Sequence, residues 1–264
     1  MEITGLSLSL GGREILRGID MTAFPGDFIC VVGRNGAGKS TLLKCIAGIH
    51  RGIFNQLSGL GKSGKIAING RDVSGMSSRD MARAVAYVPQ SAPSDTPFKV
   101  CEFLEMSRYP WRGESSKSAD KRAAEDAAGL AGVEDLMPRV MESLSGGERQ
   151  RVMIAAALAQ GASIMLMDEP TTYLDYACQS EIAEVMTRVN RERGATMIAV
   201  THDVNMAALL AGSIVAMSHG RIEWQGTPNG LLAPERLERI FGVPFEQYGT
   251  HRGGGRVLVA PAAL

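Results

Sequence analysis

The stretch Phe28-Ile-Cys-Val-Val-Gly-Arg-Asn-Gly-Ala-Gly-Lys-Ser-Thr41 decides the fold of this chain. Its first five residues are apolar and include β-branched side chains, which is typical of a buried strand. Glycines follow at once, and residues 39–47 then carry the pattern of a helix. A buried strand, a glycine-rich loop and a helix in this order predict an α/β fold with a ligand site at the carboxyl end of the strand.

The loop fits the pattern G-x-x-x-x-G-K-[ST], which marks a phosphate-binding loop when it stands between a strand and a helix. Its glycines let the backbone curl so that N–H groups point inward at phosphate oxygens. Lys39 is expected to reach the β- and γ-phosphates, and the Ser40 hydroxyl to ligate Mg²⁺. A plain glycine-rich turn is the competing interpretation, and the complete motif in this context speaks against it. The candidate phosphate-binding residues are Gly33, Arg34, Asn35, Gly36, Ala37, Gly38, Lys39, Ser40 and Thr41.

Other strands are expected on both sides of this loop. Residues 2–10 and 15–23 predict an edge hairpin, and a mainly helical block covers about residues 100–160. Residues 51–64 predict a surface loop, in which Gly61-Lys-Ser-Gly64 lacks the earlier glycine of a phosphate loop. The fold class is therefore α/β: a P-loop NTPase core with a mostly parallel sheet, an N-terminal antiparallel β subdomain and an inserted helical subdomain. The remaining predicted strands are 65–68, 86–88, 164–168, 196–201, 214–217 and 222–225.

Composition limits the possible functions. Apolar residues make up 45% and charged residues 21% of the 264 residues, as in an ordinary globular protein. The 28 basic and 28 acidic side chains cancel, so no basic field indicates a nucleic-acid partner. The four cysteines form no C-x-x-C pair, which favours a reducing compartment. No signal peptide or membrane span is predicted, so any membrane role is expected to come through a partner.

Two further strand ends carry polar residues. The apolar run 164–167 ends in Asp168 and Glu169, and another apolar strand is followed by His202. Strand ends in a parallel sheet meet at one edge, so these side chains are expected beside the phosphate loop. Asp168 suits a water-mediated contact to Mg²⁺, Glu169 suits the polarisation of an attacking water, and His202 suits a contact to the γ-phosphate. A solvated Asp-Glu pair and a structural histidine are the competing interpretations.

The stretch Leu144-Ser-Gly-Gly-Glu-Arg-Gln150 predicts a helix entrance, because good helix formers follow the glycines. Bare backbone amides and the hydroxyl of Ser145 at such an entrance suit an anion. No nucleophile stands nearby in the sequence, so the residues around this helix entrance do not identify which anion it would bind.

Taken in order, these motifs resemble those of the ATP-binding subunits of ABC transporters, over about residues 2–245. The resemblance implies an ATPase domain at 1–245, with a helical subdomain at about 100–160 and a tail at 246–264. It implies ATP and Mg²⁺ as ligands, and a head-to-tail dimer with a second copy of the chain. It also implies transmembrane permease subunits, and indirectly a substrate-binding protein, as partners at the cytoplasmic face of the cell membrane.

The resemblance assigns roles residue by residue. Glu169 matches the general base and His202 the switch histidine. Gln90, in Tyr-Val-Pro-Gln, matches the glutamine that senses Mg²⁺, so the expected metal residues are Ser40, Gln90 and Asp168. Ser145, Gly146 and Gly147 match the residues that meet the γ-phosphate of the second copy. Asp175 matches the loop that couples the two sites.

Leu10 departs from the family pattern. Family members usually carry an aromatic residue near the end of the first strand, stacked on adenine, and the equivalent position here is Leu10. We therefore expect weaker discrimination of ATP over GTP than is usual in the family.

The imported substance is suggested by shorter stretches. Residues 78–83, 107–111 and 170–175 look like those of importer ATPases for iron chelates, haem and cobalamin, and Thr171-Thr-Tyr173 favours ferric siderophores. Residues 100–112 are the expected surface for the permease's coupling helix. The aromatic residues of that segment suit the core equally well, and they are Phe103, Tyr109 and Trp111.

Three alternatives stay open. One is a soluble ATPase of the same superfamily, as in DNA repair or translation. The interval between the phosphate loop and residue 144 is short and lacks sustained heptads, which argues against the repair proteins. The second is a transporter ATPase for another substrate. The third is a regulatory subunit without turnover, which the presence of Glu169 and His202 disfavours.

Overall fold

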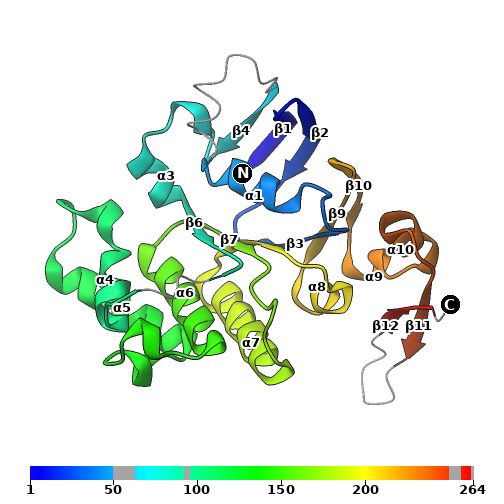
Figure 1. Ribbon diagram of the computed structural model, residues 1–264. Helices are drawn as coiled ribbons and strands as arrows, with labels where there is room; N and C mark the ends of the chain where they lie inside the picture. The colour runs from blue at the N-terminus through cyan, green and yellow to red at the C-terminus, as the bar shows by residue number, and fades with distance from the viewer. Residues whose placement is uncertain (50–62, 92–95, 250–256, 263–264) are drawn as a thin grey trace. The chain divides into compact units, whose positions relative to one another are not determined.

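The computed structural model describes residues 1–49, 63–91, 96–249 and 257–262 (Figure 1). The chain forms two compact units. The first unit comprises Met1–Ser74 and Ile198–Leu264, and the second comprises Gly75–Met197. Among the described residues, none of the helices combines the length and the apolar character that crossing a membrane requires.

An antiparallel sheet in the first unit begins with β1 (Glu2–Leu10) and β2 (Arg13–Thr22). They pair from Glu2 with Thr22 to Leu10 with Arg13, which confirms the predicted edge hairpin. β4 (Ser63–Ile68) and β5 (Arg71–Asp72) complete the order β2-β1-β4-β5. Ser63 and Gly64 thus belong to a strand and not to the predicted loop, because they extend the edge that pairs with β1. Residues 51–62 of that predicted loop lie outside the described residues.

A second sheet of the first unit carries the phosphate loop. Its strands follow the order β10-β9-β3-β8, with β3 parallel to β9. β3 (Phe28–Gly33) is buried along its whole length, as its continuous apolar run predicts. Helix α1 (Lys39–Ile46) follows the loop. The other strands are β8 (Thr196–Val200), which begins in the second unit, β9 (Ser213–Ser218) and β10 (Arg221–Gly226).

The C-terminal part of the first unit ends in a hairpin. β11 (Phe245–Gly249) pairs antiparallel with β12 (Val257–Pro261). The described residues of the predicted tail lie mainly in these two strands. Three helices precede the hairpin: α8 (Val204–Leu210), α9 (Pro228–Leu231) and α10 (Pro234–Phe241).

The second unit consists of two parallel strands and a helical block. β6 (Val85–Val88) pairs with β7 (Ile164–Asp168). Helices α4 (Val100–Met106) and α5 (Lys117–Ala131) pack against α6 (Gly146–Gln160), and the buried residues of α5 are all alanine. The predicted helical character of residues 100–160 is thereby confirmed. The helices are α3 (Ser78–Ala84), α4 (Val100–Met106), α5 (Lys117–Ala131), α6 (Gly146–Gln160) and α7 (Tyr176–Arg193), with short 3₁₀ turns such as η2 (Tyr109–Trp111).

Candidate active site

Two glycines of the phosphate loop are required by close backbone approaches. A Cβ at Gly33 would lie 2.1 Å from the carbonyl oxygen of Met217, and one at Gly38 would lie 2.9 Å from Leu16 Cδ2. Both glycines also have positive φ, at 144° and 99°. The loop therefore follows a path against β2 and β9 that a side chain would block.

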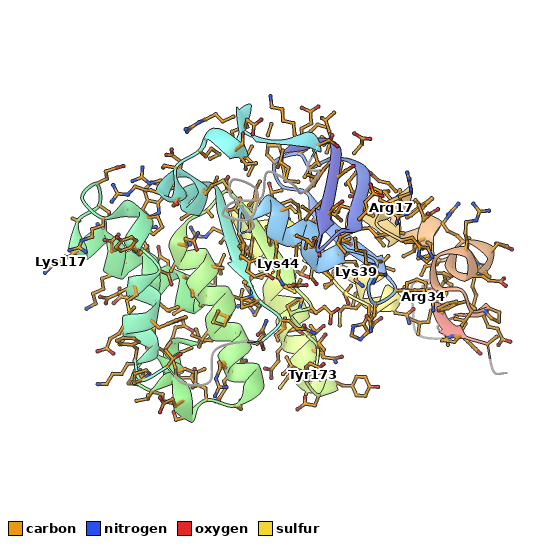
Figure 2. The ribbon with its side chains drawn as sticks, turned by 45° about the horizontal axis from the view of Figure 1, so that its top comes forward. Arg17, Arg34, Lys39, Lys44, Lys117 and Tyr173 are labelled. Carbon is orange, nitrogen blue, oxygen red and sulfur yellow. The ribbon has the colours of Figure 1, made fainter. Side chains whose placement is uncertain are left out.

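Lys39 lies at the start of α1, next to the loop that carries Arg34 (Figure 2). It is buried, with 5% of its surface exposed. Its ammonium group donates to the carbonyl oxygens of Gly33 at 2.7 Å and Arg34 at 3.0 Å. Gly38 caps α1 without a side-chain hydrogen bond, so the helix entrance presents backbone N–H groups beside a fixed cation. This arrangement fits a phosphate group.

The turn after β9 is hydrogen-bonded to the phosphate loop. The N–H of Gly220 donates to the Ala37 carbonyl at 3.1 Å, and the Gly220 carbonyl accepts from the N–H of Arg17 at 2.8 Å. A Cβ at Gly220 would lie 2.4 Å from the carbonyl oxygen of Ile15. This glycine was not singled out from the sequence, because its partners come from strands distant along the chain.

His202 also belongs to the first unit and follows β8. The N–H of the preceding Thr201 donates to the Val31 carbonyl at 3.1 Å. Since β3 and β8 are neighbours, the phosphate loop and His202 follow adjacent strands. Leu10 is half-buried at the turn end of β1, where it pairs with Arg13.

Asp168 ends β7 in the second unit and is buried, with 4% of its surface exposed. Its Oδ2 accepts a hydrogen bond from the Tyr87 hydroxyl at 2.9 Å. Burial raises the pKa of Tyr87, and the nearby Asp168 carboxylate raises it further, so the phenol stays a donor. Tyr87 was not among the predicted site residues, and its only signal is its place in the strand that pairs with β7.

Glu169 has a positive φ of 50°, which is rare for a residue with a side chain. Such a conformation costs about 1–3 kcal/mol and persists only where neighbours enforce it. Its Oε2 accepts from Gln90 Nε2 at 2.9 Å and from Thr172 Oγ1 at 3.0 Å. The structure thus joins two predicted site residues, Gln90 and Glu169, and adds Thr172, which sequence analysis missed.

Ser145 caps α6, whose first residue is Gly146. Its hydroxyl accepts from the N–H of Glu148 at 3.3 Å, and Glu148 Oε2 accepts from the N–H of Ser145 at 2.8 Å. This capping box holds the pKa of Glu148 below its usual range, chiefly through the Ser145 N–H. The hydroxyl that accepts still carries a proton to donate.

The first turn of α6 packs closely on the first turn of α7. A Cβ at Gly147 would lie 2.6 Å from Cys178 Sγ, and one at Gly146 would lie 3.5 Å from Leu174 Cδ2. Asp175 caps α7 by accepting from the N–H of Cys178 at 2.8 Å, which lowers the pKa of Asp175. Sequence analysis explained the glycines by bare amides, and the structure adds close helix packing as a second reason.

We expect Gly147→Ala to destabilise the chain by about 1–3 kcal/mol, because the new methyl group overlaps the Cys178 thiol. Alanine in a helix ordinarily raises the free energy of unfolding relative to glycine, so a decrease in this variant would indicate the overlap. Urea unfolding checks this. In a Cys178→Ala background the same substitution should cost clearly less, and an equal cost in both backgrounds would contradict the proposed overlap.

The expected metal residues are divided between the units: Ser40 lies in the first, and Gln90 and Asp168 lie in the second. Hydroxyl, amide and carboxylate oxygens are ligands that suit Mg²⁺. The described residues contain no cluster of three or more His, Cys, Asp or Glu side chains able to hold a metal ion.

Comparison with known proteins gives a consistent result. The sequence profile described as ABC transporter matches residues 16–172. The chain is 34% identical over 243 residues to the iron(3+)-hydroxamate import ATP-binding protein of Bacillus subtilis, covering 91% of this chain and 87% of that protein. It is 36% identical over 260 residues to the hemin import ATP-binding protein of Streptomyces coelicolor, covering 97% and 88%. A solved structure from Clostridium perfringens, cbiO1 of the ABC transporter complex cbiONQ, matches with a TM-score of 0.77 and 25% identity, covering 90% and 92%.

Proposed function

Because this chain belongs to the ABC transporter family, we propose that it is the ATPase subunit of an importer for an iron chelate, with a ferric siderophore favoured over haem and cobalamin. The observation that carries the ATPase role is the carboxylate of Glu169, which follows a buried strand on a backbone of positive φ and accepts hydrogen bonds from Gln90 and Thr172. The cargo is supported by relatives whose names refer to iron(3+)-hydroxamate, hemin and ferric enterobactin.

Hydrolysis proceeds by in-line attack of water on the γ-phosphorus. The water oxygen bonds to phosphorus, the bond to the bridging oxygen breaks, and Glu169 accepts the water's proton. Hydrogen bonds from Gln90 and Thr172 to Oε2 orient this carboxylate. Lys39 and the loop N–H groups stabilise the phosphate charge, and His202 contacts the γ-phosphate.

Ser40, Gln90 and Asp168 would hold Mg²⁺. When bound, the ion neutralises charge on the phosphate oxygens. Tyr87 supports this role, because its hydrogen bond fixes one oxygen of the buried Asp168 carboxylate. The remaining loop residues, Gly36 to Gly38 and Thr41, would bind the phosphates.

The capped entrance of α6 serves a second copy of the chain. Ser145, Gly146 and Gly147 meet the γ-phosphate bound to the phosphate loop of that copy, and Asp175 links the two sites. The proposal is supported by the close packing of Gly147 on Cys178, which joins the α6 entrance to the Asp175 cap.

The permease docks beside η2. A pocket of about 420 Å³ there is lined by Met106, Tyr109, Arg112 and Lys117 among others. Tyr109 is 68% exposed and is the aromatic anchor of this surface. On this proposal the chain acts at the cytoplasmic face of the membrane, and a substrate-binding protein acts indirectly through the permease.

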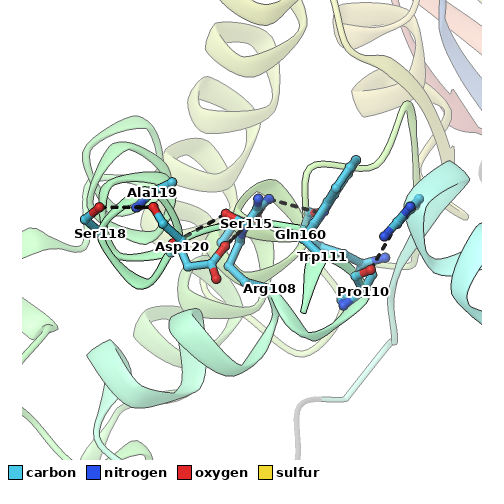
Figure 3. Close-up of polar contacts among 11 residues, drawn as sticks. Arg108, Pro110, Trp111, Ser115, Ser118, Ala119, Asp120 and Gln160 are labelled. Carbon is cyan, nitrogen blue, oxygen red and sulfur yellow. Dashed lines mark hydrogen bonds and ion pairs between the residues drawn. The ribbon is translucent and has the colours of Figure 1, made fainter. Parts of the chain in front are cut away.

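Trp111 has a structural role in that surface. The guanidinium carbons of Arg83 and Arg108 lie 4.7 Å and 5.3 Å from the centroid of its ring. Its Nε1 donates to the Gln160 carbonyl at 2.7 Å. Figure 3 shows Arg108 between Trp111 and Asp120, with which it forms a 3.0 Å ion pair. Of the aromatic residues that the sequence left open, Trp111 is packed, Phe103 is half-buried and Tyr109 is exposed.

The experiment that tests the function is co-purification of the tagged chain from detergent-solubilised membranes, with mass spectrometry of the bound proteins. A permease of an iron-chelate importer should be recovered, and Tyr109→Ala should weaken its recovery without lowering basal ATP hydrolysis. Recovery of an active chain without any permease would support a soluble ATPase instead. Recovery of a permease for another class of solute would overturn the assigned cargo.

Base selectivity gives a separate prediction. Without an aromatic side chain at Leu10, the parent protein should hydrolyse ATP and GTP with KM values within about threefold of each other, because stacking of about 1–3 kcal/mol is missing. Leu10→Tyr should lower the KM for ATP, and steady-state kinetics with both nucleotides measures this. A strong preference of the parent protein for ATP would contradict the prediction.

A further inference from the structure

Asn205 in α8 is hydrogen-bonded to the C-terminal hairpin. Asn205 Nδ2 donates to the Val259 carbonyl at 2.9 Å, and Asn205 Oδ1 accepts from the Val259 N–H at 2.9 Å. Val259 lies in the middle of β12 and is buried, with 4% of its surface exposed. The amide therefore pairs with the outer edge of β12 as a neighbouring strand would.

Asn205 stands in the first turn of α8, three residues after His202. The Asp203 carboxylate caps this turn by accepting from the N–H groups of Asn205 and Met206, both at 2.9 Å. The N–H of Asp203 in turn donates to Thr201 Oγ1 at 3.1 Å. His202 thus lies between the end of β8 and the first turn of α8, which carries Asn205.

We propose that Asn205 is a positioning residue for hydrolysis: by binding β12 it holds the first turn of α8, and thereby the His202 imidazole, in place. This rests on the role proposed above for His202. Within the hairpin, this role falls to the Val259 peptide group alone, to which Asn205 is bound. Small displacements of a reacting group have large effects on rate, while ground-state binding of ATP depends mainly on the phosphate loop.

We expect Asn205→Ala to lower kcat for ATP hydrolysis about tenfold and to change KM for ATP less than about twofold. The matched control is Gln247→Ala. Gln247 Nε2 donates to the Leu232 carbonyl at 2.7 Å, so this substitution removes another anchor of the same hairpin without touching α8. Its kcat should remain that of the parent protein. An equal loss of kcat in both variants would overturn the proposal, because loosening of the hairpin would then suffice.

A spectroscopic readout separates positioning from general damage. The chain has four histidines, and the imidazole resonance of His202 is assigned by its loss in His202→Ala. In the protein without nucleotide, Asn205→Ala should shift this resonance, and Gln247→Ala should not. An unchanged resonance in Asn205→Ala would refute the proposal.

A double-mutant cycle separates the inference from its premise. If Asn205 acts through His202, adding Asn205→Ala to His202→Ala should change kcat less than about twofold. A full additive loss would overturn the positioning role and leave the role of His202 intact. Unchanged hydrolysis in His202→Ala alone would instead overturn the proposed role of His202, and the inference with it.

Discussion

Glu169→Gln is expected to lower ATP hydrolysis by at least about 100-fold, because general-base catalysis contributes about 10²–10⁴ in rate. The amide has the size of the carboxylate and can still accept a hydrogen bond from Gln90 or Thr172, so the local structure should persist. It cannot accept the proton of the attacking water. ATP should therefore bind and remain intact, and the dimer closed on it should accumulate. Phosphate release measures the first effect, and size-exclusion chromatography with ATP measures the second.

The control for this prediction is Glu184→Gln. Glu184 is exposed on α7 of the same unit, and its substitution removes the same charge without touching the candidate site. It should hydrolyse ATP at the rate of the parent protein. Hydrolysis by Glu169→Gln at that rate would show that another group accepts the proton. A parent protein that binds ATP without turnover would support the regulatory alternative.

The elements around the phosphate loop were predictable because their signals are local. β3 and α1 begin at the predicted residues and end within one residue of the prediction, and β7 has the predicted bounds Ile164–Asp168. In each case an apolar run stops abruptly at glycine or carboxylate residues. Such boundaries are set by short-range chemistry, since neither a glycine loop nor a charged pair continues a buried strand.

The contacts that build the site were not predictable in the same way. Tyr87 and Asp168 are 81 residues apart in sequence, and Gln90 and Glu169 are 79 apart. Their pairing depends on β6 and β7 being parallel neighbours, which the pattern of single strands does not encode. Asn205 and Val259 are likewise 54 residues apart in sequence, so their hydrogen bonds could not be predicted without the position of β12.

The glycines at 146 and 147 illustrate how a correct interpretation from sequence can be incomplete. Their amides stand at a helix entrance, as predicted, but the Cys178 thiol also occupies the space that a side chain at residue 147 would need. A helix surface made of glycine permits this approach, which the sequence of α6 alone does not reveal. Residues 144–150 therefore serve both helix packing and the proposed contact with the second copy.

Ser145→Arg should abolish ATP-driven dimerisation and lower hydrolysis at least about 100-fold, an electrostatic loss of the size known for single donors in active sites. The substitution removes the hydroxyl proposed to meet the γ-phosphate of the second copy and fills its space with a long side chain. Nucleotide binding by the monomer should be unchanged, because the phosphate loop lies elsewhere in the chain. Analytical ultracentrifugation with and without ATP, and binding of a fluorescent ATP analogue, measure the two effects.

Ser116→Arg is the control that shows the effect of losing a helix cap alone. Ser116 is an exposed serine that caps α5 by accepting from the Ala119 N–H at 3.2 Å, as Ser145 caps α6. Both substitutions should lower stability by about 1 kcal/mol, since each removes one cap. Only Ser145→Arg should then affect dimerisation and hydrolysis, because a serine cap is common to both helices and the proposed γ-phosphate contact belongs to one. Intact dimerisation of Ser145→Arg, or equal losses in both variants, would refute the role assigned to the α6 entrance.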